Sequence, residues 1–302
     1  MKFKISRRTR STVLTLALAT TGVAHAQGVD WRPFLSVTPV YQGEVDLDGG
    51  GHYSAQSAMV RMGVSGDIGR GNRAGVTLSY DYTDYSFSNP VRFGNVAPWN
   101  IVQRYGVSVP LSFGLSDGWS VGLLPSVEWF RENGADAGDA FTWGGIVSAT
   151  KHFDNGNRLG FGMGVFDRIE ETSVFPFLLV DWRISDRWRL VNPLPAGPTG
   201  PAGLELEYRL DSSWNVGLGA AWRNARFRLS NDGPVPNGIG EERGVPVFLR
   251  ATHALGEQRT LSLYAGLVTA GQLRVEDSSG NELSQVDFDT APFFGATFSA
   301  RF

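Results

Sequence analysis

The sequence predicts an all-β protein, a transmembrane antiparallel up-and-down β-barrel of about 14 strands, with about 12 as the alternative count. Most of the chain alternates apolar and polar residues with the period of two that an extended strand gives. Tight turns rich in Gly, Asn, Asp and Ser alternate with longer polar connections. Short periplasmic turns and longer extracellular loops have this arrangement in outer-membrane barrels.

The composition excludes several other classes of protein. No stretch after the N-terminus is apolar for the ~18 residues that a spanning helix needs, so a membrane protein of this sequence has to span with strands. There is no cysteine, and hence no disulfide or thiolate metal site. Five of the 27 Lys and Arg precede Gln27, so 22 basic residues face 30 acidic ones in the remainder. That excess of acid is unfavourable for nucleic-acid binding.

The first 26 residues have the three parts of a secretory signal. Basic residues between Lys2 and Arg10 precede an apolar run from Val13 to Ala19, and Ala24-His25-Ala26 forms a small-x-small cleavage site. The apolar run is too short to span a bilayer. We therefore expect residues 1–26 to be a cleaved signal peptide and residues 27–302 to form the barrel.

The strands follow one another along the rest of the chain. The weakest is the segment that begins at Trp188, because four prolines follow between Pro193 and Pro201, and losing it leads to the alternative count. An even number is typical of bacterial barrels. The predicted ranges are 31–42, 55–68, 73–87, 100–115, 119–132, 140–153, 158–170, 174–185, 188–193, 202–211, 214–230, 244–255, 260–276 and 290–302.

Within these strands one face is apolar and the other small, polar or charged. The apolar faces include, in order, Leu35, Val37 and Tyr41; Val60, Met62 and Val64; Val76, Leu78, Tyr80 and Tyr82; Tyr105, Val107, Leu111 and Phe113; Val121, Leu123 and Val127; and Leu204, Leu206 and Leu210. Between Trp222 and Arg226 the alternation slips, which indicates a bulge or emergence from the membrane.

Alternation alone does not say which face is inside, because a soluble sandwich would bury the same apolar faces in its core. Three tryptophans, Trp119, Trp188 and Trp214, each directly follow a tight turn, which is typical of an aromatic girdle at one membrane interface. Together with the signal peptide and the turn and loop asymmetry, they favour the membrane barrel.

The last strand, Ala291 to Phe302, alternates regularly and ends on an aromatic residue. In this it resembles bacterial outer-membrane proteins, whose C-terminal aromatic strand is the assembly signal. The resemblance implies that Phe298 and Phe302 carry that signal. It also implies the barrel-assembly machinery, outer-membrane lipid and lipopolysaccharide as partners, in the outer membrane of a Gram-negative cell.

If the apolar faces meet lipid, charged residues of both signs line the lumen. They are Arg61, Asp81, Arg104, Glu128, Arg168, Asp181, Arg183, Glu205, Glu207, Arg209, Arg223, Arg250 and Arg274. Either they form a wet constriction for small polar solutes, or they pair across a closed, structural or ligand-binding barrel. We expect a passive pore or transporter and keep the closed barrel as the alternative.

Catalysis is the least favoured interpretation. A barrel hydrolase needs a histidine oriented against a serine or aspartate, and the mature chain has only His52, His152 and His253. The acidic residues show no spacing of a defined calcium loop. We expect no catalytic residue, metal or cofactor, and the oligomeric state stays open.

The segment Phe175-Pro176-Phe177-Leu178-Leu179-Val180-Asp181-Trp182-Arg183-Ile184-Ser185-Asp186-Arg187-Trp188-Arg189-Leu190, followed by Asn192-Pro193, carries a resemblance to a known family. It resembles an uncharacterised proteobacterial outer-membrane barrel family, still labelled a domain of unknown function. By size and by the lack of a plug, the chain is also similar in architecture to monomeric fourteen-stranded porins. Neither resemblance implies a solute or a functional residue.

Overall fold

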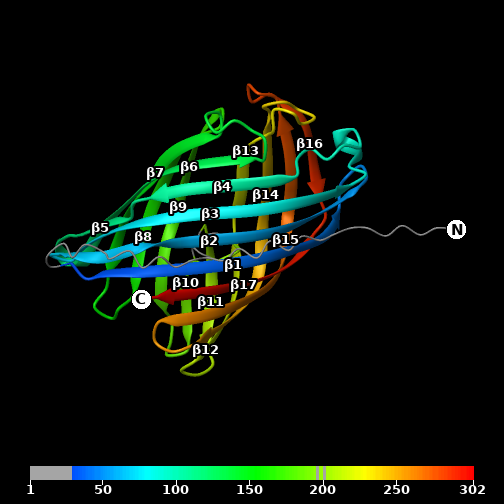
Figure 1. Cartoon of the computed structure of the whole chain (residues 1–302). Coiled ribbons are helices and arrows are strands. Elements are labelled where there is room, and N and C mark those ends of the chain that lie inside the picture. The colour runs from blue at the N-terminus through cyan, green and yellow to red at the C-terminus, as the bar shows by residue number, and fades with distance from the viewer. Residues whose placement is uncertain (1–28, 195–196, 200–201) are drawn as a thin grey trace.

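The computed structural model describes residues 29–194, 197–199 and 202–302. The predicted signal peptide, residues 1–26, lies outside them. Seventeen strand segments follow one another in a single sheet (Figure 1). They are β1 (Trp31–Asp46), β2 (His52–Gly69), β3 (Asn72–Ser88), β4 (Ile101–Ser108), β5 (Leu111–Gly114), β6 (Trp119–Glu132), β7 (Phe141–His152), β8 (Arg158–Arg168), β9 (Glu171–Arg183), β10 (Trp188–Val191), β11 (Gly203–Arg209), β12 (Trp214–Ala221), β13 (Arg223–Arg228), β14 (Ile239–Ala254), β15 (Arg259–Glu276), β16 (Glu282–Phe288) and β17 (Ala291–Arg301).

Three pairs of segments are single wall strands with a short interruption, namely β4 with β5, β12 with β13, and β16 with β17. The wall therefore has 14 antiparallel strands, and β1 pairs with β17 to close it. This confirms the predicted fold class and count. The short strand after the turn at Trp188 is present as β10 and pairs with both β9 and β11.

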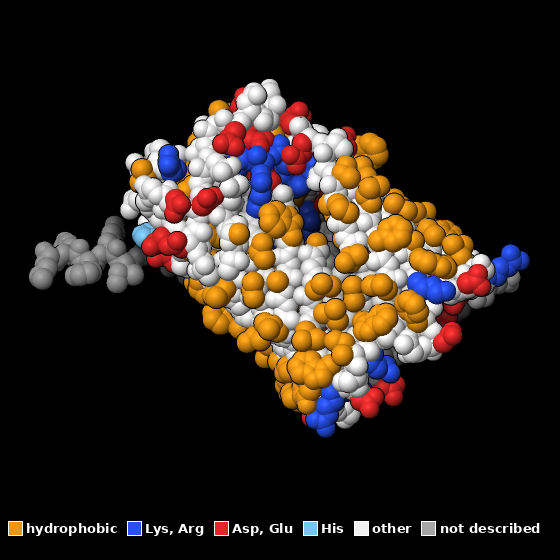
Figure 2. Space-filling model, turned by 180° about the vertical axis from the view of Figure 1, so that it is seen from behind, with side chains coloured by type: hydrophobic (Ala, Val, Ile, Leu, Met, Phe, Trp, Pro, Cys, Tyr) orange, Lys and Arg blue, Asp and Glu red, His pale blue; other side chains and the backbone are white. Residues whose placement is uncertain are grey.

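The two faces of the wall differ as the alternation predicts. Leu218, Leu249 and Phe161 point outward and are 56%, 62% and 63% exposed. Side chains on the inner face, such as those of Thr38 and Ser262, are 1% exposed. Figure 2 shows the outward hydrophobic side chains as a broad belt between two charged ends. Such a belt between polar rims is what a barrel presents to lipid.

Two β-bulges reverse the alternation in the half of the barrel opposite the tight turns, which the sequence analysis predicts to be extracellular and which we call the extracellular half. Pairing shifts between Gln42 and Val45 of β1. In β15 an extra residue lies between Thr269 and Gln272, where Ala270 has a φ of 50°. A bulge moves the following side chains to the opposite face. Beyond these points apolar side chains such as Val45 and Leu273 turn into the lumen and are 5% and 0% exposed.

These inward apolar side chains close the extracellular half of the lumen with a hydrophobic core. Trp99, from the segment between β3 and β4, lies at its centre with ring centroids 5.9 Å from Tyr85, 5.7 Å from Phe87 and 5.2 Å from Phe227. We call the cluster of Tyr53, Tyr85, Phe87, Trp99, Phe227 and Phe288 the aromatic partition. Trp99 and Phe227 are fully buried.

The bulge in β15 also overturns one sequence-based expectation. Arg274 pairs across the sheet with Glu241, and Glu241 is one residue away from the lumen-facing Glu242. Directly paired residues share a face, so Arg274 lies on the outer face of β15 and not in the lumen. The alternation counted from Tyr264 predicted the opposite because it did not include the extra residue.

The slip between Trp222 and Arg226 has another cause than the predicted bulge. The pairing of β12 and β13 with β14 keeps one register from Ala220↔Val247 to Arg223↔Gly244. Instead β13 bends into the barrel, where Arg228 forms a parallel bridge to Arg131 of β6. The outer face of β13 is thereby covered, and Arg226 is 3% exposed.

The bend leaves a gap in the wall between β9 and β13. Among the described residues, β9 pairs on this side only through Asp181, Trp182 and Arg183. Above them Asn192 of the chain after β10 caps its edge, accepting from the Val180 N–H at 2.8 Å and donating to the Leu178 carbonyl at 2.9 Å. Figure 2 shows a hollow in this side of the molecule, beneath a group of charged side chains.

Pro176 marks the free edge of β9. Residues 176 and 180 are an even number of positions apart, and the pairing of β9 with β8 shows no register shift between them. The backbone nitrogen atoms of both residues therefore point to the same side of β9, toward the gap. Proline has no N–H to donate and is confined to such edges. We call this opening the β9–β13 gap.

The connections agree with the predicted asymmetry only in part. Strands extend into three of the longer connections, since β1 and β2 leave only residues 47–51 between them, β14 begins at Ile239, and β16 covers Glu282–Phe288. β8 and β9 are joined at the extracellular end by Ile169 and Glu170 alone, with a φ of 54° at Glu170. The predicted strand ends at residues 170 and 174 left residues 171–173 as one of the longer connections, and this prediction is wrong because Glu171 already belongs to β9. No helix in the described part of the chain has the length and apolarity to cross a membrane.

Candidate functional site: the barrel lumen and its periplasmic cavity

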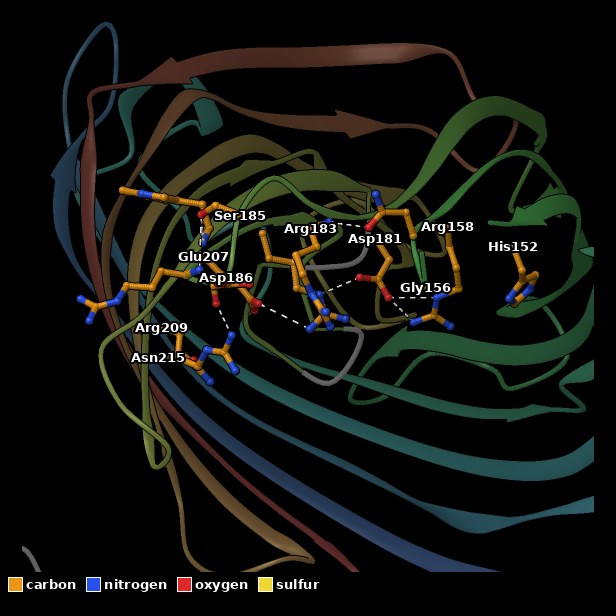
Figure 3. A pocket seen from close by; sticks show the side chains of 14 residues that line it. His152, Gly156, Arg158, Asp181, Arg183, Ser185, Asp186, Glu207, Arg209 and Asn215 are labelled. Atoms are coloured by element: carbon orange, nitrogen blue, oxygen red, sulfur yellow. Dashed lines mark hydrogen bonds and ion pairs between the residues drawn. The ribbon is translucent and has the colours of Figure 1, made fainter. Parts of the chain in front are cut away.

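A cavity lies at the tight-turn end of the lumen, the end that the sequence analysis predicts to be periplasmic, and we call it the periplasmic cavity. It has a volume of about 580 Å³ and is lined by residues of β7 to β12 and the tight turns between them. Figure 3 shows its side chains, which come from separate strands and meet inside the barrel. The turns bring them together because each one returns the chain to the same rim.

Ion pairs organise the wall of this cavity. Asp181 accepts from Arg158 Nε at 2.9 Å and from Arg189 Nε at 2.6 Å, and lies between the two guanidinium groups. Arg189 also lies 3.8 Å from Glu207. Figure 3 shows the hydrogen bonds between Arg158 and Asp181 as dashed lines. Asp181 is thus shared by two arginines, one on each neighbouring strand.

Three arginines of the cavity, Arg183, Arg187 and Arg209, have no carboxylate partner among the described residues. Arg187 donates to the Tyr208 hydroxyl at 2.9 Å. Arg183 lies at the end of β9, where its backbone N–H donates to the Asn157 side chain at 2.9 Å. Arg209, at the end of β11, donates to the backbone carbonyl of Asp186. Guanidinium groups stay charged at every physiological pH, so all three contribute positive charge, which exceeds that of Asp186, the one lining carboxylate outside the ion pairs of the described residues.

Further up the lumen, a buried ion pair spans β11 and β14. Arg250 Nε donates to Glu205 at 2.7 Å, and Arg250 also pairs with Glu207. Arg250 and Glu205 are 6% and 1% exposed. Beside them the segment after β10 enters the lumen, since a Cβ at Gly197 would meet the Tyr264 hydroxyl at 2.8 Å.

Above it, a second cavity of about 120 Å³ lies below the aromatic partition. Asp81 accepts from Arg104 Nε at 2.8 Å and pairs with Arg61, and Arg104 lies 3.8 Å from Glu128. Across the cavity Arg223 donates to Glu242 at 2.6 Å. Tyr85 of the partition donates to the same carboxylate at 2.6 Å and joins the polar and aromatic parts.

A third charged group lies at the top of the β9–β13 gap, between β13 and the β8–β9 hairpin. Arg226 donates to Glu276 at 2.6 Å and to the Ile169 carbonyl at 2.8 Å, while Arg228 donates to Glu170 at 2.9 Å. These contacts connect the inward-bent β13 to the β8–β9 hairpin. Arg168 belongs here too, because its guanidinium lies 3.6 Å from Glu171 and 3.2 Å from Asn224 of β13.

The structure distributes the predicted lumen residues among these groups. Asp181, Arg183, Glu207 and Arg209 line the periplasmic cavity, Glu205 and Arg250 form the buried pair, and Arg61, Asp81, Arg104, Glu128 and Arg223 surround the upper cavity. Arg168 faces inward but contacts β13, and Arg274 lies outside. Trp119, Trp188 and Trp214 begin β6, β10 and β12 and are 41%, 42% and 38% exposed, while Phe298 and Phe302 are 37% and 59% exposed.

Sequence reasoning missed Arg158 and Arg189, which complete the pairs of Asp181. The alternation along the strand could have identified Arg189 as a lumen residue, since it lies between the outward Trp188 and Leu190. The aromatic partition had no comparable signal, because apolar residues that point inward look the same as those that point to lipid.

The histidines do not converge on a common site. His52 lies 2.5 Å from Asp46 in the first loop, His152 lies 3.0 Å from the Ser120 hydroxyl, and His253 stacks on Trp214 at 4.4 Å. In the part of the chain that the structure describes, no group of three or more His, Asp or Glu side chains could hold a metal ion.

The fold and its lumen define a class: a closed fourteen-stranded antiparallel barrel of the transmembrane type. Within that class the chain belongs to the family "Domain of unknown function (DUF6268)", whose model matches residues 59–301. This confirms the resemblance to an uncharacterised barrel family. The comparison with curated proteins returns no match.

Solved barrels are similar in fold at low sequence identity. The COG4313 outer membrane channel from Pseudomonas putida F1 is 10% identical, with 90% of this chain and 95% of that chain covered and a TM-score of 0.46. The toluene transporter TodX from P. putida is 11% identical, with 90% of each chain covered and a TM-score of 0.44. The translocator domain of autotransporter NalP from Neisseria meningitidis is 12% identical, with 92% and 90% covered and a TM-score of 0.41.

Proposed function

We propose that the protein is an outer-membrane channel or transporter for small polar solutes, closed at its extracellular end in the conformation described here. The observation that carries this proposal is the charged interior. Paired arginines and carboxylates surround both cavities, of about 580 Å³ and 120 Å³, over most of the height of the lumen. A purely structural barrel would be equally stable with apolar side chains in its interior, because buried ion pairs add little net stability. The charged interior therefore favours a role other than stability.

The proposed location is the Gram-negative outer membrane, reached through a signal peptide cleaved after Ala26. The outward apolar belt supports a bilayer environment. Mass spectrometry of the protein from an outer-membrane fraction tests it: an N-terminus at Gln27 is expected. Recovery of the protein in the periplasmic fraction would contradict it. Assembly through Phe302 is tested by deleting that residue, which should lower the folded amount in the outer membrane.

Conductance of refolded protein in a planar bilayer tests transport. We expect unitary current steps whose size changes in Arg104→Gln or Glu128→Gln, because both side chains face the upper cavity region. Arg259→Gln is the matched control, since Arg259 is an exposed residue on the outward face of β15. Steps that respond equally to all three substitutions would show that the current does not pass this part of the lumen.

The second candidate function is a closed structural or ligand-binding barrel. The fully buried Trp99 and Phe227 of the aromatic partition favour it, because they exclude water from the extracellular half. A silent bilayer with correctly folded protein, both for the natural chain and for a variant with a trimmed partition, would support the closed barrel against the channel.

A further inference from the structure

The periplasmic cavity differs in charge from the rest of the molecule. Five arginines and three carboxylates are among its lining residues, whereas the whole chain carries a formal charge of −3. The mid-lumen and upper groups are balanced by carboxylates from neighbouring strands. Positive excess is therefore a local property of this cavity.

Three arginines without a carboxylate partner, Arg183, Arg187 and Arg209, produce this excess, since Asp186 is the one lining carboxylate outside the ion pairs of the described residues. Asp181 and Glu207 are both shared, each between two arginines, so neither is free to neutralise Arg183 or Arg209. Figure 3 shows Arg183 and Arg209 among the side chains that surround the same space. Their donors therefore remain available to a ligand.

We infer that this cavity binds small polyanions, solutes with two or three carboxylate or phosphate groups, and so selects anions for the barrel. Guanidinium groups bind such oxyanions through paired, charge-assisted hydrogen bonds. The amide side chains of Asn157 and Asn215, which also line the cavity, supply neutral donors. A volume of about 580 Å³ is within the range of small-molecule sites.

This inference deepens the proposed function by naming the solute class. The chemistry also fits a lipid phosphate, and the two sources differ in how they reach the site. A soluble anion enters from the periplasm, while a lipid headgroup would come from the surrounding bilayer. We favour the soluble anion because the lining residues lie on the inward face of β9 to β11, next to the periplasmic turns.

Calorimetric titration of the full mature protein with citrate tests the site without requiring transport. In nanodiscs of zwitterionic lipid we expect saturable binding that weakens as salt is added, and no binding of glycerol or of calcium at this cavity. The Arg183→Gln/Arg209→Gln variant should bind citrate at least about tenfold more weakly, since each charged hydrogen bond contributes on that order. Arg259→Gln is the control and should bind as the natural chain does.

Several results would overturn the inference. They are the absence of citrate binding by the folded natural chain, equal binding by the double variant and the control, or loss of citrate binding in anionic nanodiscs at constant salt, which would identify lipid phosphate as the occupant. Retained strand circular dichroism and heat-resistant migration on gels verify that the double variant is folded. Exchanging Arg183 and Arg209 for Lys should restore part of the affinity through charge alone.

The same variants separate this inference from the proposed channel. Citrate binding together with a silent bilayer would sustain the anion site and contradict the channel. Current without anion preference, measured as a reversal potential near zero in a potassium chloride gradient, would sustain the channel and contradict the anion site. If both hold, the double variant should shift the reversal potential toward that of a non-selective pore while Arg259→Gln does not.

Discussion

Trp99 is the residue whose removal should open the extracellular half of the barrel. Its indole is fully buried and lies within 6 Å of the rings of Tyr85, Phe87 and Phe227. Replacing a buried tryptophan with alanine costs roughly 3–5 kcal/mol through lost transfer energy and the cavity left behind. Three aromatic neighbours place Trp99→Ala near the upper end of that range, because each such pair adds about 0.5–1.5 kcal/mol.

The opening has a functional consequence if the protein is a channel. Without the indole, the segment between β3 and β4 loses its anchor in the lumen, and water reaches the upper cavity from outside. We expect Trp99→Ala to unfold at a lower denaturant concentration and to conduct more current per channel than the natural chain. Trp99→Phe should do neither to a comparable degree, because the indole N–H has no hydrogen-bond partner among the described residues.

Two measurements check this together, namely denaturant unfolding followed by near-ultraviolet circular dichroism, and single-channel recording. Trp222→Ala is the matched control, since Trp222 is 50% exposed on the outer surface. A folded Trp99→Ala protein whose conductance equals that of the natural chain would refute the reasoning that the aromatic partition closes the lumen. Equal loss of stability in Trp222→Ala would refute the energetic part.

Further predictions concern the buried ion pair, one loop and the orientation of the wall. Arg250→Met should destabilise the barrel by roughly 3–5 kcal/mol in urea unfolding, because it leaves the buried carboxylate of Glu205 unpaired, and adding Glu205→Gln should recover most of the loss. The pKa of Asp277 is lowered by hydrogen bonds from the Asn281 side chain and from loop backbone N–H groups. The loop is therefore stabilised above the ordinary pKa of an aspartate and loosens as the pH falls through the lowered value, as amide shifts at residues 279–281 should report. Spin labels at Leu206 should collide with oxygen dissolved in lipid, whereas labels at Glu207 should collide with a water-soluble nickel complex.

Each of these has an outcome that contradicts it. A double variant as unstable as Arg250→Met would show that packing rather than the unpaired charge sets the cost. An Asp277 titration at or above the ordinary aspartate pKa would remove the loop argument. Oxygen collisions that are more frequent at Glu207 than at Leu206 would show that the charged face of the wall meets lipid, which would contradict the proposed orientation of the barrel in the membrane.

The sequence predicted the strands well because the barrel is built from local signals. The turn before Trp119 and the turn before Trp214 fix where strands start, and hairpin pairing then sets the register. Even the 4-residue β10 was predicted between its turn and the prolines. The inward charges followed from the same parity, as for Glu205 and Glu207 beside Leu206.

The errors come from features that the alternation of apolar and polar residues does not predict. The bulge in β15 comprises Ala270 and Gly271, and the positive φ lies at Ala270, where glycine or asparagine is usual. Arg274 was consequently placed on the wrong face. The inward bend of β13 depends on contacts with Ile169 and Glu276, which are distant in sequence. Predicting the aromatic partition required the direction in which the Trp99 side chain points, and tertiary packing decides that direction.

In the proposed outer-membrane location, the β9–β13 gap bears on how the protein deforms the bilayer around it. Thr172, Val174 and Pro176 present backbone groups to the gap that no strand satisfies among the described residues, and hydrocarbon tolerates such groups poorly, at several kcal/mol each. Hydration of this edge is the cheaper arrangement, so lipid tails should retreat from it. The protein would then sit asymmetrically, with a thinned, wetter annulus along β8 to β11 and ordinary lipid thickness along the long strands β1 to β3 and β14 to β15.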